Sequence, residues 1–183
     1  MRIIAGEWKG RRLKTVKGHE TRPTADKVKG AIFNVLGEKV LGARVLDLFA
    51  GTGNLSWEAL SRGASSAILV EKDVKALSVA FQKRTLLGAE DRAQIVKAEA
   101  WQFLKNYSQG RFDLIFLDPP YRQGIVEQTL VIIKELEILN LNGVLIAETA
   151  SKEKIEGDLS PLQIRLTKEY GDTKVWFLQE DKE

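Results

Sequence analysis

The residues best suited to chemistry follow an apolar run in the second half of the chain. Phe112–Leu117 leads directly into Asp118-Pro119-Pro120-Tyr121. Consecutive prolines remove two backbone N–H donors and leave their carbonyls as acceptors beside a flat aromatic ring. Such a site suits a planar group that bears an NH2, because Asp118 and the Pro119 carbonyl can accept its hydrogens while Tyr121 stacks on its face. The alternative interpretation is a rigid loop with no chemical role.

A second motif contains two glycines in the segment Asp47-Leu48-Phe49-Ala50-Gly51-Thr52-Gly53. Gly51 and Gly53 permit a sharp turn and let a ligand approach the backbone without a Cβ in the way. A dinucleotide fingerprint would have a third glycine at position 56, where this chain has Ser56, so NAD is disfavoured. A G-x-G pair alone also occurs in tight turns that bind nothing.

An acidic residue, Glu71, follows Gly51 by twenty positions and ends the next apolar run. This is the place and spacing of a side chain that hydrogen-bonds ribose hydroxyls. By itself Glu71 would be interpreted as a surface residue or as a partner of the next helix. The preceding glycines favour the ribose interpretation.

The elements that must position these motifs alternate along the chain. Apolar runs predict strands at 45–49, 67–71, 94–97, 112–117 and 143–149, a terminal hairpin at 164–170 and 173–179, and helices at 24–36, 54–63, 74–88, 100–106 and 125–139. Strands separated by helices indicate a doubly wound α/β fold with a mostly parallel, seven-stranded sheet. In such a sheet, ligands bind beyond the carboxyl ends of the strands, near the point where strand order reverses.

Composition excludes several classes of protein. The 183 residues include no cysteine and one histidine, His19, which argues against thiol chemistry, a multi-histidine metal site and a Ser-His-Asp triad. No apolar run reaches the roughly 18–20 residues that span a bilayer, and the first residues do not form a secretory signal. We therefore expect a cytoplasmic protein that needs no metal or membrane.

Charge is distributed unevenly along the chain. Residues 1–29 hold nine basic and three acidic side chains, a net charge of +6, whereas the whole chain carries +3. We expect residues 1–20 to form a basic N-terminal β-hairpin extension that turns at Gly10, and residues 21–183 to form the catalytic domain. A basic extension on an acidic body suits a polyanion, although a solvated hairpin would have the same composition.

With these motifs in hand, the chain resembles the S-adenosylmethionine-dependent amino-methyltransferases, which carry a D/N/S-P-P-Y/F/W tetrapeptide. Flanking residues narrow the resemblance to bacterial 16S ribosomal RNA guanine-N2 methyltransferases of the RsmD type. These are Arg2–Gly6, Gly10-Arg11, Arg22-Pro23-Thr24 with Asp26, Phe33-Asn34, Phe49–Gly53 and Glu58–Ala64. The resemblance covers essentially the whole chain and implies a Rossmann-like fold.

The resemblance also implies roles for individual residues. Asp47, Gly51 and Gly53 would shape the methionine end of the cofactor site, Glu71 would hold the ribose, and Glu99 and Ala100 would lie near the adenine. Trp101 could flank the adenine, although a place in the core at the start of a helix is the favoured interpretation. Asp118, Pro119, Pro120 and Tyr121 would form the catalytic loop. The charge of the extension separately suggests that Lys9, Arg11, Arg12 and Lys14 contact RNA phosphates, with Trp8 as a possible surface for stacking on a base. Arg22, at a helix start, would either lie at the mouth of the substrate site or take part in helix packing.

The implied reaction methylates the exocyclic N2 of a guanine in ribosomal RNA or a small-subunit assembly intermediate, with the protein acting as a monomer. An adenine-N6 methyltransferase of RNA or DNA is the alternative, because the tetrapeptide would grip either NH2 group. A protein-glutamine methyltransferase and a non-catalytic nucleic-acid-binding module also stay open. The basic extension disfavours the glutamine substrate, and the intact motifs disfavour the non-catalytic module.

Overall fold

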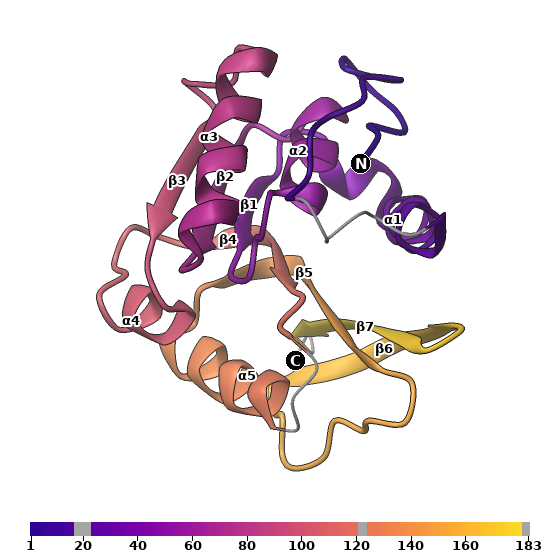
Figure 1. Cartoon of the computed structure of the whole chain (residues 1–183). Coiled ribbons are helices and arrows are strands. Elements are labelled where there is room, and N and C mark those ends of the chain that lie inside the picture. Colours follow the sequence, from indigo (N-terminus) through magenta and orange to yellow (C-terminus); the bar gives the residue numbers. More distant parts are fainter. Residues whose placement is uncertain (17–22, 121–123, 181–183) are drawn as a thin grey trace.

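The computed structural model describes residues 1–16, 23–120 and 124–180, which form a seven-stranded sheet flanked by helices (Figure 1). The elements in chain order are α1 (Pro23–Leu36), a 3-10 helix (Gly37–Val40), β1 (Arg44–Asp47), α2 (Asn54–Ser61), β2 (Ser66–Glu71), α3 (Val74–Leu87), β3 (Ala93–Lys97), α4 (Ala100–Lys105), β4 (Phe112–Leu117), α5 (Ile125–Leu136), β5 (Leu139–Ala150), β6 (Leu162–Tyr170) and β7 (Thr173–Glu180). The expected doubly wound α/β fold is confirmed.

The strand order is β3-β2-β1-β4-β5-β7-β6. β1 to β5 pair in parallel, and β7 pairs antiparallel with both β5 and β6. The chain first builds outward from β1 to β3 and then crosses back to place β4 on the other side of β1. Strand order therefore reverses between β1 and β4, which is where a ligand site is expected in such a sheet.

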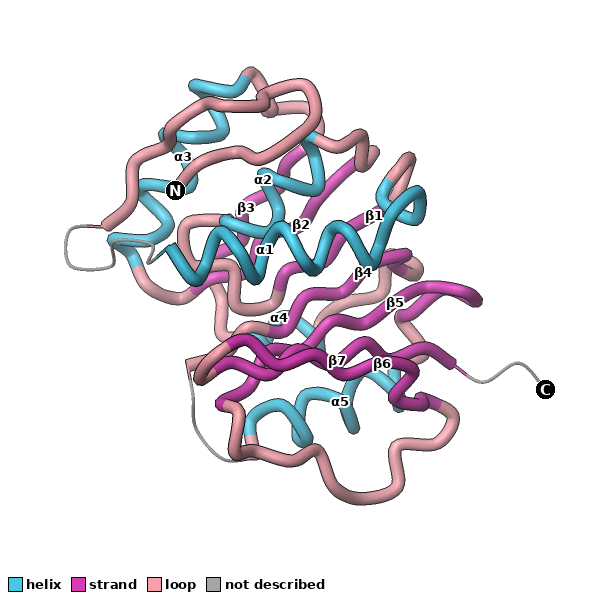
Figure 2. Tube along the Cα trace, turned by 90° about the vertical axis from the view of Figure 1, so that its right-hand side faces the viewer, coloured by secondary structure: helices cyan, strands magenta, loops and turns pink. Residues whose placement is uncertain are grey.

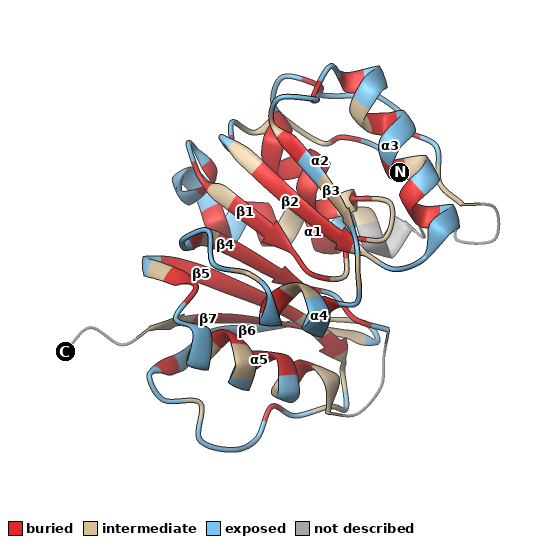
Figure 3. Cartoon of the chain, turned by 90° about the vertical axis from the view of Figure 1, so that its left-hand side faces the viewer, coloured by how far each residue is buried: buried red, intermediate tan, exposed pale blue. Residues whose placement is uncertain are grey.

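Two apolar cores lie on the two faces of this sheet. Figure 2 shows that helices cover both faces. Successive strand residues alternate between them, so Val45 and Leu114 pack with α1, α2 and α3, whereas Leu46 and Ile115 pack with α4 and α5. The inner strands β1, β2, β4, β5 and β7 are mostly buried, whereas the edge strand β6 is largely exposed and the edge strand β3 is partly exposed (Figure 3). This burial on both faces explains the continuous apolar runs in the sequence.

The helix predicted at 74–88 is present as α3, and its ends are set by local residues. The Asp73 side chain accepts a hydrogen bond of 2.7 Å from the Ala76 N–H and so caps the helix. Gly88 ends it in the left-handed conformation, with φ of +62°.

The predicted extension of α5 to residue 139 is wrong. The helix ends at Leu136, and Glu137 turns the chain in the left-handed region, with φ of +49°. Ile138 then accepts a 2.7 Å hydrogen bond from the Phe112 N–H, and Leu139 begins β5. The apolar spacing continues unbroken through Ile138 and Leu139, but these residues join the sheet instead of the helix.

The N-terminal segment, which we define as residues 1–14, folds back on itself as expected and turns near Gly10, with φ of +83°. The expected β-hairpin, however, has only one antiparallel β-bridge among the described residues, between Arg2 and Arg12. Ile3, Trp8 and Leu13 are buried in the core that covers α2. Trp8 is only 3% exposed, so its prediction as a surface for stacking on a base is wrong. The expected boundary near residue 20 lies outside the described residues.

Candidate active site

The glycine loop, residues 50–53, lies between the carboxyl ends of three strands. The Leu48 N–H donates to the Phe116 carbonyl at the end of β4, and the Ala50 N–H donates to the Val70 carbonyl in β2. Gly51 and Gly53 adopt φ of +54° and +84°. A Cβ at Gly53 would collide with Trp57, whereas one at Gly51 would meet no atom within 4 Å. Gly53 is therefore required by packing, and Gly51 faces open space.

Glu71 fastens this loop to the end of β2. Its Oε2 accepts a 2.8 Å hydrogen bond from the Gly51 N–H, and its Oε1 accepts from the Lys72 and Asp73 N–H groups. A carboxylate has about four acceptor positions, so one on Oε2 is left for a ligand hydroxyl. Glu71 therefore supports the start of α3 and also keeps an acceptor beside the glycine loop. Its role in binding a ribose stays a prediction.

Asp47 lies beneath the loop with only 2% of its surface exposed. Burial raises its pKa to about 7, and the nearby Asp118 and Glu71 carboxylates push the pKa in the same direction. The Ser56 hydroxyl donates a 2.7 Å hydrogen bond to Asp47 Oδ2. Ser56 stands where a dinucleotide site would have its third glycine, and the structure gives it the role of holding Asp47.

Asp118 and Pro119 follow β4 immediately and lie next to the end of β1, because Asp47 is in register with Phe116. Solvent reaches the Asp118 side chain, and no described residue donates a hydrogen bond to it. Surrounding protein nevertheless desolvates the carboxyl and raises its pKa to about 6. Pro119 is buried and Pro120 exposed. Tyr121, the fourth residue of the predicted catalytic loop, lies outside the described residues.

The sequence analysis missed one acidic residue at this edge, Glu148 of β5. Leu117 is in register with Ala147, so Asp118 and Glu148 occupy adjacent positions just beyond. Burial raises the pKa of Glu148 well above its ordinary value, and the charges of Asp118 and Asp47 add to the effect. Its position near the carboxyl end of the next parallel strand was the signal that could have identified it.

Glu99 and Ala100 mark the start of α4, at the neighbouring carboxyl end of β3. Glu99 forms an exposed ion pair of 3.2 Å with Lys72, which follows Glu71, so the ends of β2 and β3 are joined at the surface. Ala100 is buried, whereas Trp101 is 42% exposed. The interpretation of Trp101 as a core residue is therefore wrong.

The predicted RNA-binding residues are spread over the length of the N-terminal segment. Its turn lies at the opposite edge of the sheet from Asp118, because the Glu7 N–H bonds Ser61 at the end of α2 and Arg11 bonds the Leu86 carbonyl near the end of α3. Lys9 and Arg11 are exposed there. Arg12 is exposed beside Arg2, nearer the glycine loop. Arg22 lies outside the described residues.

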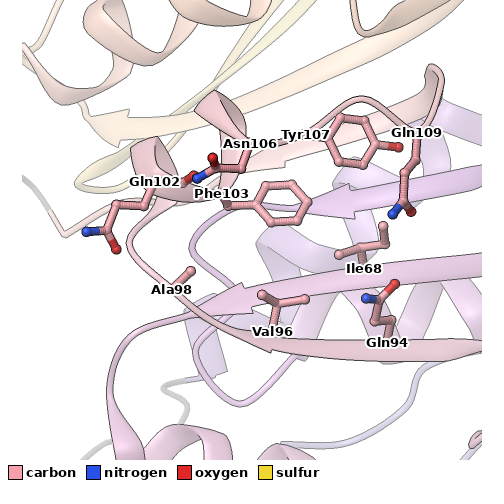
Figure 4. A pocket seen from close by; sticks show the side chains of 9 residues that line it. All are labelled: Ile68, Gln94, Val96, Ala98, Gln102, Phe103, Asn106, Tyr107 and Gln109. Carbon is pink, nitrogen blue, oxygen red and sulfur yellow. The ribbon is translucent and has the colours of Figure 1, made fainter.

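A hollow of about 430 Å³ lies apart from these residues, on the flank formed by β2, β3 and α4 (Figure 4). Ile68 and Val96 form its floor, Phe103 and Tyr107 lie opposite, and Gln94 and Gln109 reach toward one end. None of the candidate site residues lines it. The described residues contain no group of His, Cys, Asp or Glu side chains arranged to bind a metal ion. No helix among them is long and apolar enough to cross a membrane.

Comparisons with known proteins place this geometry in a family. Residues 1–179 match the family described as conserved hypothetical protein 95. "Putative rRNA methyltransferase YlbH" of Bacillus subtilis is 39% identical over 177 residues, 96% of each chain. The ribosomal RNA small subunit methyltransferase D of Haemophilus influenzae is 36% identical over 172 residues, 92% of this chain and 87% of that protein.

Among solved structures, "Putative methyltransferase yhhF" from Escherichia coli superposes with a TM-score of 0.90 and 30% identity, over 100% of this chain and 99% of that one. The sheet, its flanking helices and the N-terminal segment are thus shared over the full length. The chain belongs to the conserved hypothetical protein 95 family, has RsmD-type proteins among its relatives, and adopts the Rossmann-like methyltransferase fold.

Proposed function

We propose that the chain transfers a methyl group from S-adenosylmethionine to the exocyclic N2 of a guanine in 16S ribosomal RNA. The observation that carries the proposal is the adjacency of the glycine loop and Asp118-Pro119 at the carboxyl ends of β1 and β4. A cofactor site and an acceptor site for an NH2 group therefore share one edge of the sheet. The names of two relatives describe ribosomal RNA methyltransferases, which supports ribosomal RNA as the class of substrate.

The residues at this edge fit S-adenosylmethionine, which supplies an electrophilic methyl group on a sulfonium and leaves as S-adenosylhomocysteine. The open face above Gly51 gives room for close approach to the backbone, and the free acceptor on Glu71 Oε2 suits a ribose hydroxyl. Asp47 lies beneath the loop at the expected methionine end, and Glu99 and Ala100 lie at the expected adenine end.

Asp118 and the Pro119 carbonyl would activate and aim the target nitrogen. Its lone pair is delocalised into the guanine ring, so the amine is a poor nucleophile until its N–H bonds are polarised. Two acceptors on those hydrogens raise the electron density on nitrogen and fix the direction of attack. Orientation of this kind can supply several kcal/mol, about 7–11 in favourable cases. The base must be unstacked to reach the acceptors.

Asp118 would also stabilise the positive charge that develops on the target nitrogen. As the N–C bond forms, the nitrogen becomes cationic, and an adjacent carboxylate stabilises that charge. The nitrogen then loses a proton to become a neutral secondary amine. Because desolvation raises the pKa of Asp118 to about 6, this carboxylate accepts a proton near neutral pH more readily than an ordinary aspartate.

RNA contacts would begin at the end of the N-terminal segment nearest the glycine loop. A hollow of about 500 Å³ between this segment and α1 is lined in part by Arg2, Lys27 and Asn34, which offer charged and neutral donors to phosphate. Asp26 also lines it, and its carboxylate is paired with Lys29. Arg12, beside Arg2, extends the same basic surface. Lys9 and Arg11 would contact the phosphates of RNA that extends toward the amino edge of the sheet.

The test is to incubate the protein and labelled S-adenosylmethionine with unmodified small ribosomal subunits, followed by digestion to nucleosides. N2-methylguanosine is the expected product. Label recovered only as N6-methyladenosine would favour the adenine alternative, and absence of label from all nucleic acid would favour a non-catalytic binding module. Naked 16S ribosomal RNA, tested in parallel, shows whether assembled protein is needed for recognition.

A further inference from the structure

A buried lysine on α3 holds the centre of the glycine loop. Lys83 Nζ lies 2.8 Å from Thr52 Oγ1 and 2.9 Å from the Thr52 carbonyl oxygen, and its side chain is only 2% exposed. Thr52 lies between Gly51 and Gly53, so the Lys83 ammonium group binds the hydroxyl and the carbonyl of the central residue of the loop. The Trp57 indole N–H donates a second hydrogen bond, of 2.8 Å, to the same carbonyl.

A second buried lysine holds the end of the loop. Lys29 Nζ of α1 lies 2.9 Å from Oδ1 of Asn54, the first residue of α2, and 2.6 Å from the Arg2 carbonyl oxygen. Its charge is balanced by Glu58 at 3.5 Å and Asp26 at 3.7 Å. Only 1% of Lys29 is exposed.

Both lysines also reach the N-terminal segment, which is fastened to α2 along its length. Lys83 Nζ lies 3.1 Å from Met1 Sδ, and Lys29 bonds Arg2. Glu58 then accepts hydrogen bonds from the Ile4 and Ala5 N–H groups. Lys83 therefore joins the basic segment to the glycine loop, and Lys29 joins it to the first residue of α2, directly after the loop.

We propose that Lys83 and Lys29 are positioning residues of the cofactor site, which hold Thr52 and Asn54 in place and make the N-terminal segment a structural part of that site. This inference rests on the proposed use of S-adenosylmethionine. A loop fixed before binding loses little conformational entropy when the ligand arrives, so pre-organisation raises affinity. The Lys83 contacts are with protein atoms and not with the reacting groups, so its removal should act on binding and leave the chemical step intact.

The chemistry of Lys83 supports a positioning role over a packing role. Burial and the nearby Lys29 charge lower its pKa to about 7, so the site is costly for an ammonium group. No carboxylate among the described residues forms an ion pair with it. An apolar side chain of the same length would fill the space without this cost, but it could not bond Thr52.

The first test measures binding of S-adenosylhomocysteine by calorimetry to the wild type, Lys83→Met and Lys75→Met. Lys75 lies on the same helix and is exposed, which makes it the matched control. We expect Lys83→Met to weaken binding at least about tenfold and Lys75→Met to leave it unchanged. In turnover assays, the KM for S-adenosylmethionine should rise by a similar factor, with kcat within about twofold of wild type. Equal affinity for wild type and Lys83→Met would overturn the inference.

A second pair of variants keeps the test decisive if Lys83→Met does not fold. Thr52→Ser retains the hydroxyl that Lys83 holds, whereas Thr52→Val keeps the shape and loses it. We expect Thr52→Val to bind S-adenosylhomocysteine several-fold more weakly and Thr52→Ser to bind as wild type does. Equal loss in both variants would contradict a role for this hydrogen bond.

Hydrogen exchange of the ligand-free protein gives a readout that is independent of the cofactor. Backbone amides of residues 51–54 should exchange faster in Lys83→Met than in Lys75→Met, with the strands of the sheet unchanged. Unchanged exchange at 51–54 would overturn the inference. If the wild type itself bound no S-adenosylhomocysteine, the proposed function would fail instead, so the two failures are distinguishable.

Discussion

Two regions of the molecule desolvate charged side chains, and they differ in what those side chains contact. At the carboxyl edge of the sheet, Asp118 and Glu148 receive no hydrogen bond from a described residue, and the negative charge of Asp118 opposes ionisation of Glu148. Between the helices and the N-terminal segment, Lys29 and Lys83 each bond several fixed oxygen atoms. Both arrangements oppose ionisation, but only the second uses the charge to hold other atoms in place.

This difference separates reactive groups from structural ones. A buried group whose partners are all within the protein has little left to offer a ligand, whereas a desolvated carboxyl without partners keeps its acceptors for a substrate. Asp47 is intermediate, because Ser56 occupies one of its oxygens. We therefore expect substitutions at the acidic edge to change the reaction and substitutions among the lysine contacts to change binding and stability.

The largest effect is expected for Asp118→Ala. Loss of a group that stabilises charge in the transition state typically lowers kcat about 10²–10³-fold. Affinity for S-adenosylhomocysteine should survive, and the free energy of unfolding should not fall, because Asp118 has no described partner to lose. Single-turnover kinetics and calorimetry measure the two quantities. Asp91→Ala, an exposed change at the opposite edge, is the control. Unchanged turnover in Asp118→Ala would show that polarisation of the amine is not its role.

Glu58→Gln should produce the largest loss of stability. Glu58 is fully buried, pairs with Lys29 and Arg62, and accepts two N–H groups of the N-terminal segment. Removal of one partner of a buried pair typically costs about 3–5 kcal/mol. Because Asp26 still lies 3.7 Å from Lys29, we expect a loss near the lower end of this range. Urea denaturation measures this cost, and the exposed Glu156→Gln is the control.

The double variant Glu58→Gln/Lys29→Met sharpens this test. Once the unpaired ammonium is also removed, part of the lost stability should return. If the double variant were less stable than the sum of the two single losses, the ion pair would not be the reason for the effect of Glu58→Gln.

Much of the candidate site could be predicted from the sequence, and each residue that was missed has a physical reason. Asp47, Gly51, Glu71 and Asp118 lie at strand ends, so a pattern of apolar runs is sufficient to place them on one edge. Glu148 was missed because it stands inside the apolar run of β5 and not after it. An acidic residue inside a strand gives no sign of a site unless the strand's position in the sheet is known.

The roles of the N-terminal segment were predicted least well. Basic composition predicts a surface for RNA, but it does not show which side chains are buried. Trp8 lies in the core with the Arg92 guanidinium 4.9 Å above its ring. Lys29 and Lys83 could not be distinguished from solvent-facing lysines, because their hydrogen-bond partners lie 25 to 82 residues away along the chain, and the nearby ion pair of Lys29 with Asp26 is also typical of an exposed helix. Contacts this distant leave no local pattern.

A pH titration of stability compares the two regions directly. Asp47 has its pKa raised to about 7, so the folded state binds more protons than the unfolded chain from about pH 4 to 7, and stability falls as pH rises through that range. Lys83 has its pKa lowered to about 7, so the folded state binds fewer protons above pH 7, and stability rises again toward pH 10. Each proton contributes a slope of at most about 1.4 kcal/mol per pH unit.

These groups therefore predict a minimum in the free energy of unfolding near pH 7, measurable by urea denaturation across the pH range. Asp47→Asn should reduce the slope on the acid side, where the raised pKa values of Asp118 and Glu148 also contribute, and leave the alkaline side unchanged. Lys83→Met should flatten the alkaline side and leave the acid side. A wild-type curve that rises steadily from pH 5 to 7 would contradict the raised pKa values at the carboxyl edge, and one that falls from pH 7 to 10 would contradict the lowered pKa of Lys83.

The smallest effects concern RNA affinity, and they compare the two ends of the N-terminal segment. Arg12 lies beside Arg2 near the glycine loop, whereas Lys9 lies at the turn by the opposite edge. Each phosphate contact that is lost should reduce the slope of log K against log salt by about one unit. We expect this reduction for Arg12→Ala, with less or none for Lys9→Ala and none for Lys168→Ala on β6. Binding titrations with a 16S ribosomal RNA fragment at several salt concentrations measure the slopes. A larger loss in Lys9→Ala than in Arg12→Ala would mean that RNA is held mainly across the amino edge, and the basic surface beside the glycine loop would then need another explanation.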